Sequence, residues 1–123
     1  MKIEINQIGS SAGITNAING VSQIGMSSRD LKQEEIDADI EQFVIAHDGI
    51  VVVVHPSNGV KDLTVEQVKA IFTGSITNWK AVGGEDQEIV VVSREEGSGS
   101  RDAFQEIVSY ESGEICISVW KLL

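Results

Sequence analysis

Apolar and polar side chains in residues 2–26 follow two different periods. Residues 2–8 alternate apolar and polar side chains, which predicts a short strand. Residues 14–21 carry apolar side chains at i, i+3, i+4 and i+7, which predicts an amphipathic helix that ends near Gly20. Residues 23–26 predict a second short strand. A strand–helix–strand order is typical of a parallel sheet.

Three further apolar runs predict more strands. Residues 43–55 read FVIAHDGIVVVVH, and the β-branched run 50–54 predicts a strand that is buried on both faces. Residues 88–92 predict another buried strand, and residues 116–123 predict one more.

Two helices are predicted between these runs. Thr64 is followed three residues later by Gln67, which is the pattern of a capping box, and Gly74 marks the end of this helix. A second helix is predicted over residues 98–109 from its apolar face. The alternation of strands and helices indicates an α/β fold with a mostly parallel sheet.

Composition narrows the class of protein. The chain has 123 residues, 19 acidic and 9 basic side chains, and a net charge of −10, which argues against a nucleic-acid partner. Its single Cys excludes an internal disulfide framework, and no metal or cofactor motif is present. No apolar run approaches 18 residues, and the opening MKIEINQ lacks the pattern of a signal peptide. The acidic residues in 34–41 predict a solvated, partly helical surface.

Two loops rich in Gly and Ser each join a predicted strand to a predicted helix. These are Gly9–Gly13 and Gly97–Ser100. A helix N-terminus presents unpaired N–H groups and a partial positive charge, and small residues let an oxyanion approach them. Ser27 and Ser28 end another predicted strand, where ligands of open α/β sheets bind. Each loop taken alone is also explained as a helix cap.

Arg94 strengthens the second loop as an anion site. It precedes Ser98 by four residues at the end of a predicted strand, and a guanidinium can bind an oxyanion through two parallel hydrogen bonds. Glu96 is predicted to hold Arg94 in place. The alternative for Arg94 alone is a surface ion pair. The combination of Arg94 with the Gly-Ser-Gly-Ser turn favours anion binding.

Each enzymatic alternative lacks at least one part that its chemistry requires. The sequence has no Gly-Lys pair for a nucleotide P-loop, and Asp102 interrupts the dinucleotide pattern that begins at Gly97. Serine hydrolysis would need a G-x-S-x-G elbow together with a His partner, but His47 and His55 both lie in the apolar strand region, where each is expected to be a core or edge histidine. A phosphoryl-transfer enzyme would need a lysine, a carboxylate pattern for Mg²⁺ and a general base, and the sequence shows no such set. We therefore expect a binding protein and not an enzyme.

Five segments together resemble the phosphate-binding protein of bacterial phosphate ABC transporters. They are IGSSAGI, IGMSSRDL, DGIVVVVHPSN, LTVEQVKAIFTGSITNWKAVGG and VVVSREEGSGSRDAF, and the resemblance covers about residues 3–108. It implies a periplasmic-binding-protein-like fold of two α/β lobes (a Venus flytrap) that binds inorganic phosphate in the cleft between them. It also implies a location outside the cytoplasmic membrane and a membrane permease as partner.

The resemblance also implies which residues bind phosphate, position by position. Ser100 replaces the Thr that is usual in the family and keeps its hydroxyl, and Ser28 stands where some members carry an Asp that accepts a phosphate proton. The implied phosphate ligands are Ser10, Ser28, Arg94, Ser98, Gly99 and Ser100, with support from Ser11, Ser27 and Glu96.

Length is the main departure from the family. The resemblance implies that residues 1–45 form part of the first lobe, that 46–110 form a portion of the second, and that 111–123 are a divergent tail. About half of the family domain lacks a counterpart here, so we expect exposed sheet edges and self-association. The alternative function is a self-associating structural domain of the same fold that binds no ligand.

Overall fold

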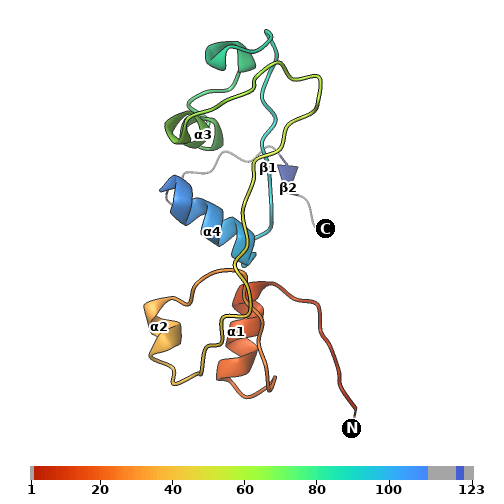
Figure 1. Cartoon of the computed structure of the whole chain (residues 1–123), viewed down its shortest axis with the longest axis vertical. Helices are drawn as coiled ribbons and strands as arrows, with labels where there is room; N and C mark the ends of the chain where they lie inside the picture. The colour runs from red at the N-terminus through yellow and green to blue at the C-terminus, as the bar shows by residue number, and fades with distance from the viewer. Residues whose placement is uncertain (1, 111–118, 121–123) are drawn as a thin grey trace. The chain divides into compact units, whose positions relative to one another are not determined.

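The computed structural model describes residues 2–110 and 119–120, and these residues form two compact units. Among the described residues, the first unit contains 2–49 together with Glu96–Ala103, and the second contains Ile50–Glu95 together with 104–110 and 119–120. The order of elements is α1 (Ser10–Ile18), α2 (Gln33–Ile36), α3 (Val65–Phe72), η1 (Trp79–Val82), β1 (Val92–Ser93), α4 (Gly99–Val108) and β2 (Val119–Trp120) (Figure 1).

All three longer helices form where the sequence predicts them. The capping box is confirmed on α3, since Gln67 N–H donates to Thr64 Oγ1 at 3.2 Å and Thr64 N–H donates to Gln67 Oε1 at 2.9 Å. Gly20 and Gly74 follow α1 and α3 with φ of 67° and 76°, a conformation that favours glycine.

Most of the predicted strands are wrong. The structure has no strand in three of the predicted segments, which are 2–8, 23–26 and 43–55 and lie within the described residues. In Figure 1, residues 2–8 are drawn without a helix or an arrow. Val51 and Val53 are 77% and 81% exposed, so the run 50–54 is not buried on both faces. A strand is stabilised by hydrogen bonds to a neighbouring strand, and no such neighbour lies beside these segments within the described residues.

The sheet of the described residues is one parallel pair. Val92 of β1 pairs with Val119 of β2, and Ser93 pairs with Trp120. The pair confirms parallel pairing, and β2 lies inside the strand predicted over 116–123. The strand predicted over 88–92 shifts to β1. Its burial is wrong as well, because Val90 is 59% exposed and only one face of this segment is covered.

The second unit has an apolar core under α3. Ile71, Ile89 and Val91 are buried together, and partly buried side chains pack around them: Leu63, Phe72, Ile76 and Trp79. Phe72 also packs against Phe104, with ring centroids 4.7 Å apart.

The first unit packs through small residues instead. A Cβ on Gly13 of α1 would lie 2.8 Å from the Met26 carbonyl oxygen, and a Cβ on Gly25 would lie 3.1 Å from Ala17 Cβ. Glycine therefore lets α1 lie directly against the backbone of residues 25 and 26. This packing sets the position of the residues that follow, Ser27 and Ser28.

Candidate functional site

Two helix N-termini meet in the first unit. Ser10 is the first residue of α1, and Gly99 is the first residue of α4. A Cβ on Gly99 would lie 2.6 Å from Ser28 Oγ and 2.9 Å from Ser10 Cβ. The structure therefore brings together three of the predicted phosphate ligands, Ser10, Ser28 and Gly99, although they are far apart in the sequence.

Hydrogen bonds join the two serines. Ser28 N–H donates to Ser10 Oγ at 3.1 Å, and the two hydroxyl oxygens lie 3.3 Å apart. Ser10 is only 7% exposed, whereas Ser28 is exposed. A hydroxyl can donate and accept at once, so the pair keeps donor capacity for an anion on its exposed side.

The two Gly/Ser loops pack against each other. Ser11 N–H donates to the Gly97 carbonyl oxygen at 3.3 Å, and a Cβ on Gly9 would lie 2.7 Å from that oxygen. Gly97 has a φ of 85°, where a side chain would be strained. Ser98 is 3% exposed, and Ser100 lies in the first turn of α4. The loops that the sequence singles out separately form one structure.

The local field at this point favours an anion. The N-termini of α1 and α4 each carry a partial positive charge, and no side chain caps α1. Gly9, the residue before α1, has no side chain that could satisfy the first-turn N–H groups. An oxyanion with several acceptor oxygens suits such a pair of helix ends.

Arg29 also belongs to this region, although it is not among the site residues predicted from the sequence. Its side chain is 4% exposed and forms ion pairs with Glu35 of α2 at 2.7 Å and Asp102 of α4 at 3.1 Å. The hydrogen bond from Arg29 lowers the pKa of Glu35 to about 2, and the hydrogen bond to Glu35 raises the pKa of Arg29. Glu35 is thus an exception to the predicted solvated face of residues 34–41. Spacings of 6 and 73 residues give no sequence signal for these pairs.

The predicted supporting serines contact Arg29. Ser27 Oγ accepts a hydrogen bond from Arg29 N–H at 3.2 Å and donates to the Arg29 carbonyl oxygen at 2.8 Å. Ser11 Oγ accepts from Arg29 Nη2 at 3.5 Å. Both serines therefore act on the loop that carries Ser28.

Arg94 belongs to the second unit and binds its own neighbour. Arg94 Nε and Nη2 donate to the two carboxylate oxygens of Glu95 at 2.9 and 2.7 Å. The hydrogen bond to Glu95 raises the pKa of Arg94, and the Arg94 side chain is 41% exposed. The sequence predicts that Glu96 orients Arg94, and that role of Glu96 stays a prediction.

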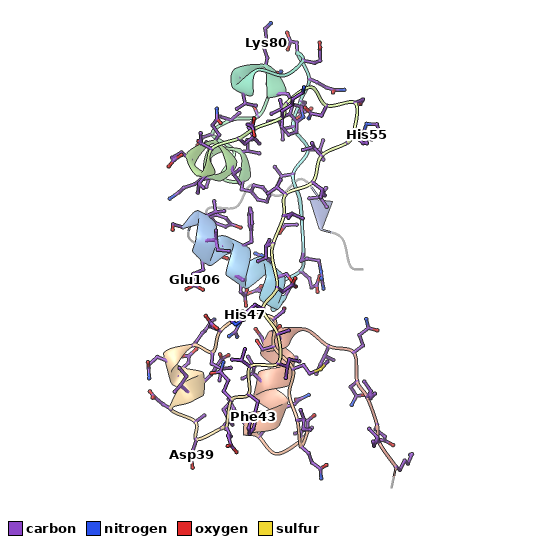
Figure 2. All side chains as sticks on the ribbon, in the orientation of Figure 1. Asp39, Phe43, His47, His55, Lys80 and Glu106 are labelled. Carbon is purple, nitrogen blue, oxygen red and sulfur yellow. The ribbon has the colours of Figure 1, made fainter. Side chains whose placement is uncertain are left out.

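Other features of the described residues offer little alternative chemistry. An open hollow of about 460 Å³ in the second unit is lined by Val53, His55, Trp79 and Glu85, among others, and by none of the predicted phosphate ligands. Figure 2 shows His55 at the outside of this unit, where its Nδ1 lies 2.7 Å from Ser57 Oγ.

Within residues 2–110 and 119–120, no cluster of three His, Cys, Asp or Glu side chains could hold a metal ion. None of the helices there is long and apolar enough to cross a membrane.

The chain belongs to the PBP superfamily, since the family model for the PBP superfamily domain matches residues 1–117. The match continues beyond residue 108, where the resemblance seen in the sequence ended. The expected periplasmic-binding-protein-like α/β fold is confirmed by this match and by the solved structures.

The relatives are phosphate-binding proteins by name. The phosphate-binding protein PstS of Borreliella burgdorferi is 35% identical over 107 residues, which are 87% of this chain and 38% of that protein. Phosphate-binding protein PstS 2 of Streptococcus agalactiae is 52% identical over 77 residues, or 63% of this chain and 26% of the relative.

A solved structure with phosphate bound matches most of the chain. It is a putative phosphate ABC transporter substrate-binding protein from Clostridium perfringens, 60% identical, with a TM-score of 0.91 over 96% of this chain and 49% of that protein. An ABC-type phosphate transport receptor from Vibrio cholerae matches with 43% identity and a TM-score of 0.68, over 87% of this chain and 44% of the receptor. The chain thus spans at most about half the length of these proteins.

Proposed function

We propose that this chain is a solute-binding module that captures inorganic phosphate for an ABC transporter. The observation that carries the proposal is the meeting of two helix N-termini at Ser10 and Gly99, with Ser28 hydrogen-bonded to Ser10. Helix ends and hydroxyl groups donate hydrogen bonds, and phosphate offers four oxygens to accept them. The names of the relatives support the choice of phosphate among oxyanions.

Each predicted ligand has a role in this proposal. Ser10, Ser28 and Ser100 donate from hydroxyl groups, while Ser98 and Gly99 offer backbone N–H groups at the start of α4. Arg94 supplies the positive charge, with Glu96 as its orienting acid. Ser28 replaces a carboxylate that some family members use as a proton acceptor, so we expect weaker discrimination against sulfate here.

The proposal includes a non-enzymatic role, a membrane permease as the receiving partner and a location outside the cytoplasmic membrane. These follow from the resemblance to transport receptors and not from the geometry. The net charge of −10 is compatible with anion capture, because helix dipoles and hydroxyl groups act at contact distance whereas distant surface charges are screened.

Calorimetric titration with phosphate, and with sulfate as a second ligand, tests the proposal. Arg94→Ala is expected to weaken phosphate binding about 100-fold, because charge-assisted hydrogen bonds contribute about 1.5–3 kcal/mol. Lys61→Ala is the matched control, since it removes one exposed positive charge from the same unit. A folded wild-type protein that gives no phosphate heat would contradict the proposal, as would equal losses in both variants.

Self-association is the second candidate role, supported by exposed apolar side chains. Ile5, Phe43 and Val53 are 85%, 72% and 81% exposed, in segments with no strand partner among the described residues. Unpaired apolar segments favour pairing with a second copy. Light scattering after size-exclusion chromatography should then give at least twice 13.3 kDa. A monomer at high concentration would contradict it.

A further inference from the structure

Arg29 uses all of its donor capacity within the first unit. A guanidinium has five N–H donors, and the guanidinium of Arg29 donates five hydrogen bonds. Nε donates to Asp102 at 3.1 Å, Nη1 donates to the Asp30 carbonyl oxygen and to Glu35 at 2.8 and 2.7 Å, and Nη2 donates to Glu35 and Ser11 at 2.7 and 3.5 Å. All of the N–H groups of Arg29 therefore donate to the protein itself, and we assign Arg29 no direct contact with a ligand.

The partners of Arg29 lie on the elements that form the candidate site. Asp102 is in the first turn of α4, three residues after Gly99, and Ser11 is in the first turn of α1. Arg29 itself directly follows Ser28 in the chain. One buried side chain thus connects the Ser28 loop to both helix N-termini.

The charges around Arg29 have a second consequence for an anion. Glu35 and Asp102 are carboxylates that face the guanidinium, and Lys32, the residue before α2, donates its backbone N–H to Glu35 at 2.8 Å. A carboxylate in the first turn of α4 repels an anion at the same helix end unless a cation neutralises it. Arg29 supplies that cation.

We propose that Arg29 is a positioning residue: it holds the Ser28 N–H and hydroxyl against Ser10 and Gly99 by binding Asp102 and Glu35 at once. The proposal deepens, and rests on, the proposed phosphate site. It concerns the geometry of the site, so part of its test needs no ligand.

The ligand-free arm of the test measures amide hydrogen exchange by NMR in the full chain. In Arg29→Gln, exchange at Ser28 N–H should rise at least about tenfold, because its bond to Ser10 Oγ opens locally. Asn19 N–H, which donates to Thr15 O at 3.0 Å at the other end of α1, should change less than twofold. Arg29→Lys should fall between wild type and Arg29→Gln. Unchanged exchange at Ser28, or an equal rise at both amides, would overturn the proposal.

The ligand arm measures phosphate affinity in a double-mutant cycle. Arg29→Gln should weaken binding about tenfold in the wild type but less than about twofold in the Ser28→Ala background, since the Ser28 hydroxyl that it positions for the anion is then gone. Equal losses in both backgrounds would overturn the positioning role. Lys80→Gln removes an exposed ion pair with Asp86 and is the control. If the wild type binds no phosphate, the proposed function fails, and the exchange arm still decides the role of Arg29.

Discussion

Gly99→Ala is the substitution for which the structure gives the sharpest prediction. Gly99 is the first residue of α4, so alanine would ordinarily stabilise the helix by about 0.5–1 kcal/mol. Here the new Cβ would overlap Ser10 Oγ and lie 2.6 Å from Ser28 Oγ and 2.9 Å from Ser10 Cβ. A hydroxyl can rotate away, but Ser10 Cβ moves only with the α1 backbone.

The cost of this overlap follows from those contacts. Forcing one extra carbon into a packed site costs about 1–3 kcal/mol, which exceeds the gain in helix propensity. The net loss should be about 1–2 kcal/mol, or a fall in Tm of roughly 4–8 °C. Phosphate affinity should fall in the same variant, because Ser10 and Ser28 must separate.

Thermal and urea unfolding of Gly99→Ala beside Gly59→Ala measure this effect. A Cβ on Gly59 would meet nothing within 4 Å, so Gly59→Ala should change stability by less than about 0.5 kcal/mol. If Gly99→Ala were as stable as the wild type, the close contact of the two helix N-termini would be refuted.

Three further predictions concern stability. Thr64→Ala should lower the free energy of unfolding by about 1 kcal/mol in urea titrations, because it removes the capping box of α3. Phe72→Ala should cost about 2–3 kcal/mol in the same assay, since the ring contacts the apolar core and Phe104, and Phe72→Leu should recover part of the loss. The pKa of Glu35, lowered from 4.5 to about 2, means that its contribution is present above pH 4.5 and is lost as the pH falls towards 2. The wild type should therefore lose up to about 3 kcal/mol more than Glu35→Gln across that window in urea titrations at each pH, and parallel curves would contradict the ion pair.

Local signals in the sequence predicted the helices well. The capping box of α3 needs residues only three positions apart, and an apolar stripe repeats within one or two turns. The Gly/Ser loops were also readable, because a small-residue turn before a helix has a local meaning. The convergence of Ser10, Ser28 and Gly99 was expected from the family resemblance and from the rule that ligands bind at the ends of strands.

Features that depend on distant partners were not predictable in the same way. The run 50–54 has the composition of a buried strand, but composition does not say whether a neighbouring strand is present to pair with it. The sequence does not distinguish Arg29 from other basic residues, because Glu35 and Asp102 contact it only after α2 and α4 have folded against it. Both failures have one cause: pairing across the fold leaves no periodic trace in the sequence.

The small residues of the candidate site therefore have two roles, close packing of the loops and exposure of helix N–H groups. At some positions a substitution cannot change one role without the other. At Gly9 and Gly99, the absence of a side chain lets the two loops touch, and the same absence exposes helix N–H groups to an anion. A substitution there must weaken packing and binding together. Ser100 differs, because it is only partly buried and the role proposed for it rests on its hydroxyl alone. A loss of phosphate affinity in Ser100→Ala with unchanged stability would thus report on binding chemistry, whereas the loss in Gly99→Ala reports on the architecture that makes binding possible.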